Sequence, residues 1–186
     1  MIIRDRVPED AAALEAIARV THRVDRYPKY LPDDVRSFIV SADAVRAWVA
    51  VRDGRVIGQI ALHEKSVPEV MDLVRAATGL PEDRVIVIAR LLVDPGARRA
   101  GVGRALLDRA VEEATRMGRR AVLDVVEEHT AAIALYDGAG WTQLGTVEWS
   151  LPGDLWFREF VYLAPGPRTG RGGHCDVRGW TRRFGA

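Results

Sequence analysis

The hydrophobic residues of this 186-residue chain recur with two different periods, which separate expected strands from expected helices. Short apolar or alternating runs, typical of β-strands, cover residues 2–6, 48–52, 55–62, 85–93, 121–126, 141–149 and 156–163. Apolar residues three and four positions apart indicate helices that begin at Pro8 and after Asp33 and that cover 68–78, 102–117 and 130–137. This order predicts an α/β (mixed α+β) fold in which strands outnumber helices.

Turn residues connect these elements in a definite way. Asp53-Gly54 lies between two strands and is a strong hairpin signal. The run 85–93 is the most apolar in the chain and suits a strand covered on both faces. Helix 102–117 follows it and leads to strand 121–126, so the three elements predict a right-handed parallel crossover within a mixed sheet.

Composition excludes several classes of protein. Hydrophobic residues make up 48% of the chain, and the formal net charge is only +1, so no global field favours a nucleic acid or a membrane. No apolar run approaches the ~20 residues of a membrane span, and no membrane partner is expected. The single cysteine, Cys175, excludes an internal disulfide and a multi-cysteine metal site, and no metal is predicted. The first residues lack a secretory signal, which favours a cytoplasmic location.

The last residues differ in composition from the rest. Residues 164–186 contain six glycines, five arginines and one aspartate, a local charge of +4. We expect this segment to be a disordered basic tail after a folded domain that covers 1–163. Trp180 and Phe184 could stack on bases, which makes an RNA- or ribosome-binding tail an alternative. The charge is small, so nucleic acid is not an expected partner.

The segment between strand 85–93 and helix 102–117 carries the main chemical signal. It consists of Arg98, Arg99, Ala100, Gly101, Val102, Gly103 and Arg104. A helix N-terminus presents free N–H groups to a diphosphate, glycines permit close approach, and arginines add charge-assisted hydrogen bonds. This pattern predicts a pyrophosphate-binding loop.

Other nucleotide loops fit the segment less well, and a solvated basic loop remains an alternative. A Walker loop requires Gly-Lys-Ser/Thr, which is absent. A dinucleotide fingerprint requires a tight turn directly after the strand and a third glycine or alanine, where this chain has Leu106. Only Asp124, about twenty residues further on, matches the ribose-binding acid of such a site.

Three motifs together resemble the GNAT superfamily of N-acetyltransferases. They are Val93-Asp94-Pro95 at the strand end, Arg98-x-x-Gly101-x-Gly103 in the loop, and Leu135-Tyr136 followed by Gly140-Trp141. The resemblance is specific from Val85 to Trp141 and does not extend to the tail. It implies a mainly antiparallel sheet of six to seven strands flanked by helices, with acetyl-CoA as the cofactor.

The resemblance also implies site roles. The acetyl group would pass to a primary amine of a small molecule or peptide by direct attack on the thioester. The main chain of Leu92 and Val93 would pair with the pantetheine, and Tyr136 would be the general acid, although packing alone also explains that tyrosine. A homodimer is left open.

The catalytic base cannot be assigned from the sequence. Many relatives place a glutamate where this chain has Ala89, and strand 85–93 contains no carboxylate. The remaining candidates are His63, Glu64, Glu127, Glu128 and His129. The missing carboxylate makes a non-catalytic acyl-CoA-binding or sensor domain the alternative function.

Further residues are expected to bear on the acceptor. Arg90, isolated in an apolar strand, is expected to pair with Asp124, or else to bind an acceptor carboxylate. Helix 68–78 either adds a side layer or roofs the acceptor site. The remaining acceptor-side candidates are Arg26, Tyr27, Lys29 and Tyr30.

Overall fold

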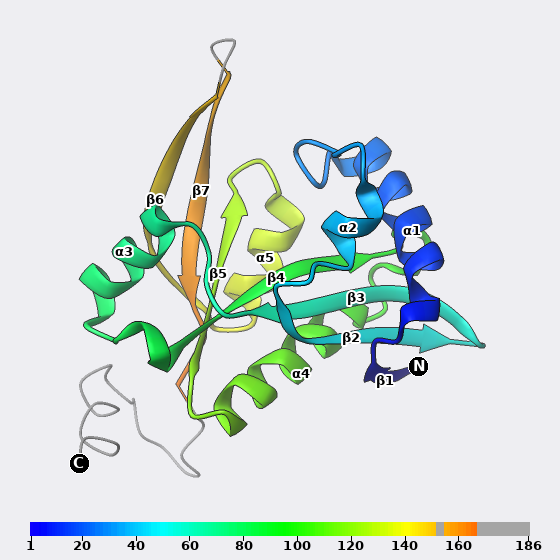
Figure 1. Cartoon of the computed structure of the whole chain (residues 1–186), viewed down its shortest axis with the longest axis horizontal. Coiled ribbons are helices and arrows are strands. Elements are labelled where there is room, and N and C mark those ends of the chain that lie inside the picture. Colours follow the sequence, from blue (N-terminus) through cyan, green and yellow to red (C-terminus); the bar gives the residue numbers. More distant parts are fainter. Residues whose placement is uncertain (152–154, 167–186) are drawn as a thin grey trace.

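The computed structural model describes residues 1–151 and 155–166, which form one seven-stranded sheet covered by helices on both faces (Figure 1). The strands are β1 (Ile2–Asp5), β2 (Ala44–Arg52), β3 (Arg55–His63), β4 (Val85–Val93), β5 (Arg120–Val126), β6 (Thr142–Leu151) and β7 (Leu155–Leu163). The α-helices are α1 (Ala11–Asp25), α2 (Val35–Ile39), α3 (Pro68–Thr78), α4 (Val102–Arg116) and α5 (Thr130–Gly138). Single 3₁₀ turns precede α1, β4 and α4, at Pro8–Asp10, Glu82–Arg84 and Pro95–Ala97.

The sheet has the order β1-β2-β3-β4-β5-β7-β6, and every neighbouring pair is antiparallel except β4 and β5. Strands β4 and β5 are parallel, and α4 connects them. The prediction of a mixed, mainly antiparallel sheet with one parallel strand–helix–strand unit is therefore confirmed. The Asp53-Gly54 hairpin is also confirmed, because both residues have positive φ, 50° and 73°.

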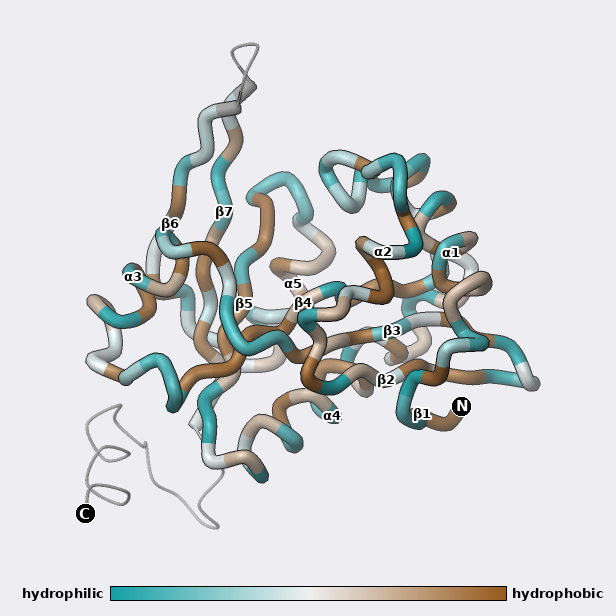
Figure 2. The backbone as a smooth tube through the Cα atoms, viewed as in Figure 1, coloured by the Kyte–Doolittle hydropathy of each residue, from teal (hydrophilic) through white to brown (hydrophobic). Residues whose placement is uncertain are grey.

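Alternate residues of β4 show which helices cover which face. Ile86 and Ile88 pack in a core with Leu106 and Leu107 of α4. Val85 and Val87 point to the other face, where α3 lies, and α1 and α2 cover that same face farther along the sheet. Figure 2 shows hydrophobic colouring along the central strands, whereas the connection between α1 and α2 is mainly hydrophilic.

The helix predicted over 68–78 adds a layer to the sheet. Val70, Met71 and Val74 of α3 are buried against β6 and β7, including Val147 and Val161. Gly145 on β6 permits this contact, because a Cβ there would lie 3.1 Å from Cδ1 of Leu73. The additional-layer interpretation of this segment is the one the packing supports.

Three local features go beyond what the sequence pattern predicts. The helix predicted to begin at Pro8 opens with a 3₁₀ turn and continues as α1 to Asp25. The residue that caps α5 is His129, whereas Thr130 is already helical. Glu113 of α4 has a side chain only 5% exposed, and its carboxylate contacts Arg46, Arg109 and Arg116.

The described residues end soon after the predicted domain boundary. Ala164 is 3% exposed, and its N–H donates to the carbonyl of Ala121 at 2.8 Å. Most of the predicted tail, including Cys175, Trp180 and Phe184, lies outside the described residues, as do Pro152 and Gly153. The disorder of that tail stays a prediction.

Candidate active site

Strands β4 and β5 separate halfway along their length. They pair only through Val85–Arg120, Ile86–Ala121 and Val87–Val122, although the strands continue to Val93 and Val126. Figure 1 shows the two strands running apart beyond this point. We call residues 88–93 and 123–126 the β4–β5 divergence. The predicted pantetheine-binding residues, Leu92 and Val93, lie on its β4 side.

The predicted pyrophosphate loop connects the end of β4 to α4. Among the described residues, no acceptor is present for the six backbone N–H groups from Arg99 to Arg104. Arg99 and Gly101 have φ values of 59° and 75°, and Gly101 is the N-terminal cap of α4. Free N–H groups in such a turn, continued into a helix N-terminus, form an anion-binding concavity. The donors that a diphosphate requires are therefore present.

The two glycines of this loop serve different purposes. A Cβ added to Gly101 would meet nothing within 4 Å, so this residue faces open space and is required by its positive φ. A Cβ on Gly103 would lie 3.4 Å from Cδ2 of Leu135 and 3.7 Å from Cγ2 of Val93. The expectation that both glycines face the ligand thus needs correction, because Gly103 faces the packing of α4 against β4 and α5.

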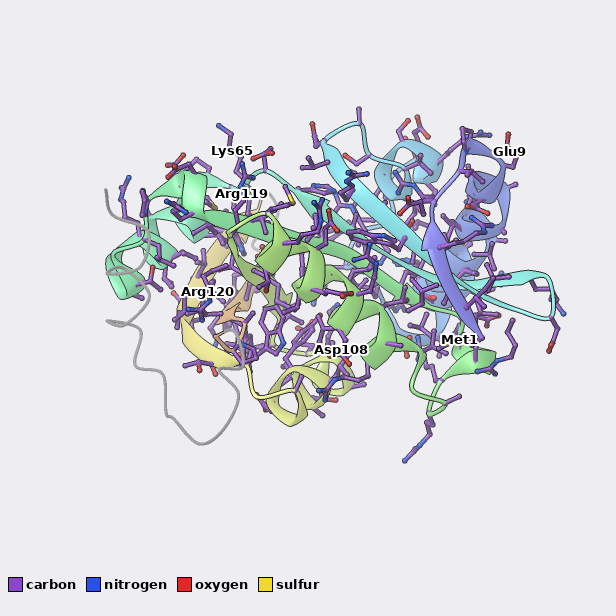
Figure 3. The ribbon with its side chains drawn as sticks, turned by 90° about the horizontal axis from the view of Figure 1, so that it is seen from below. Met1, Glu9, Lys65, Asp108, Arg119 and Arg120 are labelled. Atoms are coloured by element: carbon purple, nitrogen blue, oxygen red, sulfur yellow. The ribbon has the colours of Figure 1, made fainter. Side chains whose placement is uncertain are left out.

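The three arginines of the loop are held differently. Arg98 forms an ion pair with Asp25 at the end of α1. Nε of Arg104 lies 2.8 Å from Oδ1 of Asp108, which is labelled on α4 in Figure 3. Arg99 is exposed and contacts no acidic side chain in the described part of the chain. Arg99 is therefore the arginine most readily available to an anion.

Tyr136 lies on α5 within the core that faces α4. Its side chain is 5% exposed and its ring packs between Trp141 and Tyr162, each with a centroid 5.8 Å away. Burial, and then the neighbouring Tyr27 and Asp124, raise its pKa well above its usual value. The phenol therefore keeps its proton throughout the neutral range, and its packing role is already evident.

The expected direct pair between Arg90 and Asp124 does not form. Arg90 has φ of 56° in a β-bulge where two β4 residues face Ile60. Its Nε donates to the carbonyl of Phe38 at 3.0 Å, and its guanidinium carbon lies 3.8 Å from the centre of the Phe38 ring. Asp124 instead accepts from Oγ of Ser66 at 3.0 Å.

Most candidate bases are engaged elsewhere. Three of them form ion pairs, which join Glu64 to Arg119, Glu127 to Arg158 and Glu128 to Lys29. Figure 3 labels Arg119 close to Lys65, which follows Glu64 in the chain. Burial lowers the pKa of the imidazoles of His63 and His129, and Nε2 of each is buried without a hydrogen-bond partner among the described residues.

The connection between α1 and α2 lies beside these residues. Tyr27 contacts His129 edge-on with ring centres 5.5 Å apart, and Tyr30 lies 6.5 Å from the ring of Phe157 on β7. Lys29 pairs with Glu128, and Arg26 ends α1 with φ of 57°. The segment thus lies beside the paired ends of β5 and β7, and its role toward the acceptor stays a prediction.

Sequence reasoning missed one carboxylate in this region, Glu159 on β7. Indole Nε1 of Trp149 donates to Oε2 of Glu159 at 2.7 Å. Burial, followed by the charge of Asp124, raises the pKa of the Glu159 carboxyl to about 7. The sequence contained a signal for it. Glu159 is spaced by two residues from Phe157 and Val161 and by four from Leu163, so it shares the face of the strand that these apolar residues occupy.

Comparison with known proteins agrees with this architecture. A model of the acetyltransferase (GNAT) family matches residues 11–141. The chain therefore belongs to the GNAT acetyltransferase family, whose cofactor is acetyl-CoA.

Two curated relatives match over shorter stretches. A tRNA-acetylating toxin of Mycobacterium tuberculosis is 38% identical over 96 residues, which are 49% of this chain and 57% of the toxin. A mycothiol acetyltransferase of Geodermatophilus obscurus is 46% identical over 52 residues, which are 27% of this chain and 17% of that enzyme. Each match thus spans less than two thirds of the relative's length.

A solved structure extends the likeness to the fold. NAA60 of Arabidopsis thaliana in complex with acetyl-CoA is 22% identical, with a TM-score of 0.63 over 87% of this chain and 96% of that one. None of the helices in the described residues has the length and apolar composition needed to cross a membrane. The same residues hold no group of three His, Cys, Asp or Glu side chains placed to bind a metal ion.

Proposed function

We propose that this protein is an acetyl-CoA-dependent N-acetyltransferase that acts on a primary amine of a small molecule or a peptide. The observation that carries this proposal is the β4–β5 divergence beside six unpaired N–H groups at the start of α4. The first offers strand backbone to an extended chain with amide groups, and the second offers donors to a diphosphate. Coenzyme A contains both features in one molecule.

The residues of the chain fit this cofactor at both ends. Backbone groups from Arg98 to Arg104 would hold the pyrophosphate, with Arg99 adding a charge that no described side chain neutralises. Leu92 and Val93 would hold the pantetheine, because β4 is not paired with β5 at that level. The bound thioester supplies an acetyl group that a neutral amine can attack directly.

Tyr136 is the residue we propose for protonating the departing sulfur. A phenol whose pKa is raised is a weaker acid than usual, while a thiol of coenzyme type has a pKa near ~8.5. Full proton transfer is therefore uphill, so the hydroxyl would act mainly by donating a hydrogen bond as charge develops on sulfur. Burial among Trp141 and Tyr162 fixes the ring for this purpose.

The experiment is a thiol-release assay with acetyl-CoA across a panel of amines, amino acids, aminoglycosides and peptides. Transfer-RNA belongs in the panel because one relative is named a tRNA-acetylating toxin. Release of coenzyme A together with acetylated amine supports the enzyme. Tight coenzyme A binding without turnover on any amine would favour the alternative, a non-catalytic acyl-CoA-binding or sensor domain.

A further inference from the structure

Two carboxylates lie on one face of the sheet next to the β4–β5 divergence, one on β5 and one on the following strand of the sheet, β7, although β4 itself has none. Asp124 of β5 lies opposite Val161, and Glu159 of β7 lies opposite Val126. Residues directly opposite in an antiparallel pair point to the same side, so both carboxylates share one face and are diagonal neighbours, with Cα atoms about 7–8 Å apart. Their side chains can thus reach a single ammonium group between them.

We propose that Glu159 is the base that removes the proton from the acceptor's ammonium group, and that Asp124 holds this group beside it. The proposal rests on the N-acetyltransferase function proposed above. Many relatives have a glutamate base on the strand that corresponds to β4, where this chain has Ala89. The proposal assigns the role of base to β7 instead.

The surroundings of Asp124 indicate that it lies at the centre of this region. Its charge raises the pKa of Tyr27, Tyr136 and Glu159, in addition to the larger effect of burial on each. These three residues come from the α1–α2 connection, from α5 and from β7. The amine, the base and the proposed sulfur ligand Tyr136 would therefore meet around one carboxylate.

A purely structural role does not account for Glu159. Among the described residues no cationic side chain pairs with it, whereas its neighbour Arg158 pairs with Glu127 at 3.0 Å. A partly buried carboxylate without a counter-charge costs stability. Trp149 binds Oε2 and leaves Oε1 without a partner in the described structure. The free oxygen is what a base requires.

Aromatic rings extend from Glu159 toward solvent. The ring of Trp149 lies 6.5 Å from that of Phe157, which lies 6.5 Å from that of Tyr30. Tyr30 is 47% exposed and belongs to the α1–α2 connection. Aromatic faces attract organic cations, so this row suits an acceptor that arrives as an ammonium ion.

The groups around Glu159 give the proposed base its pH dependence. Asp124 is the titratable neighbour whose charge acts on Glu159. Burial raises the pKa of the Asp124 carboxyl, while the hydrogen bond from Ser66 and the charge of Arg90 oppose that shift. Glu148 and Arg158 of the same hairpin alternate with Glu159 and so lie on the opposite face. On α3, Asp72 is paired with Arg75.

The proton balance is complete without another reactant. An N–H bond of the acceptor breaks as an O–H bond forms on Glu159, and the nitrogen lone pair becomes free. That lone pair forms the C–N bond to the acetyl carbon while the C–S bond breaks and its electron pair stays on sulfur. Tyr136 donates a hydrogen bond to the sulfur, and the second proton lost by the nitrogen reaches the thiolate through solvent. Glu159 releases its proton to water.

The test compares Glu159→Gln with Glu148→Gln, an exposed residue on the other face of the hairpin, using the full chain and an amine that the wild type acetylates. At pH 7 we expect Glu159→Gln to lower kcat/KM for the amine by about 10²–10⁴. The deficit should shrink toward pH 10, where a lysine-like amine of pKa ~10.4 is increasingly neutral without help. Glu148→Gln should match the wild type, and coenzyme A affinity should be unchanged in both variants.

A second variant and a second readout distinguish a base from a merely structural residue. Trp149→Phe removes the hydrogen bond that favours the carboxylate, so it should move the acidic limb of the pH–rate profile upward. Carboxyl NMR of the free protein should show one signal that titrates near neutral pH and that is absent in Glu159→Gln.

The outcomes separate the two proposals. A wild type that acetylates no amine overturns the proposed function and the base with it. An active wild type with an equally active Glu159→Gln overturns the base alone. The base is also overturned if the acidic limb disappears in His129→Gln and not in Glu159→Gln.

Discussion

Replacing Gly101 with alanine tests the pyrophosphate loop most directly. Gly101 caps α4 with φ of 75°, a conformation that costs an L-residue about 1–2 kcal/mol. The added methyl group meets no protein atom within 4 Å, so the cost to folding should stop there. For a domain of this size we expect the Tm to fall by about 2–8 °C, with the fold intact.

Coenzyme A binding should suffer more than stability. The methyl group of Gly101→Ala points into the space where we place the diphosphate. Losing one hydrogen bond to a charged group costs about 1.5–3 kcal/mol, which corresponds to an affinity about 10- to 150-fold weaker. Gly101→Asp adds a negative charge as well and should abolish binding. Calorimetric titration with coenzyme A measures both changes.

Gly103→Ala is the matched control in the same loop. Its Cβ would make ordinary contacts with Leu135 and Val93, and alanine is preferred over glycine in a helix by up to about 1 kcal/mol. This variant should bind coenzyme A within twofold of the wild type and melt at the same or a higher temperature. Unchanged affinity in folded Gly101→Ala and Gly101→Asp, or equal losses in Gly101→Ala and Gly103→Ala, would refute the assignment of the loop.

Four other variants test separate parts of the structure. Tyr136→Phe keeps the ring packing but loses the hydroxyl, so kcat should fall by about 10²–10⁴ with little change in the KM for acetyl-CoA. If this variant turns over at the wild-type rate across pH, the residue is purely structural. Gly58→Ala would place a Cβ 2.6 Å from the carbonyl oxygen of Leu92. Unfolding followed by circular dichroism should therefore show a loss of stability of about 1–3 kcal/mol. Coenzyme A affinity should also fall, because the added Cβ displaces β4. Arg90→Ala removes a charged hydrogen bond to Phe38 and should cost about 1.5–3 kcal/mol of stability; an unchanged Tm with a raised KM for the acceptor would instead make Arg90 an acceptor ligand. Burial raises the pKa of Glu159 from 4.5 to about 7 on folding, so the wild type should lose stability as pH rises through that interval. The Tm advantage of Glu159→Gln over the wild type should therefore grow between pH 5 and pH 8. A constant Tm difference would contradict the raised pKa.

The elements of the fold were readable because each has a local signal. The apolar run of β4, the Asp53-Gly54 turn and the amphipathic stripe of α4 are fixed within a few residues, and the structure places all three as expected. The proposed cofactor loop has a local signal as well. Its glycines, arginines and helix start are consecutive, so the prediction of an anion-binding loop depends on no long-range contact.

The rest of the site depends on contacts between distant segments. Arg90 was expected to face Asp124 because adjacent strands usually pair side by side, but a β-bulge turns it toward Phe38, fifty-two residues earlier in the chain. Glu113 has the helical spacing of a solvent-facing residue, yet Arg46 of β2 lies beside it. Glu159 acquires its character from Trp149 and Asp124, and no local pattern specifies those neighbours.

The separation of β4 from β5 leaves a strand edge inside the sheet. Beyond Val87 the β5-facing side of β4 has no partner strand in the described part of the chain. The same condition makes the outer edge of a sheet prone to pairing with other chains. A bound pantetheine would cover that edge from within. Without cofactor we therefore expect the amide protons of this side to exchange quickly and the protein to aggregate more readily. Cofactor concentration would then set how much protein persists in solution, because a ligand that binds only the folded chain stabilises it by mass action.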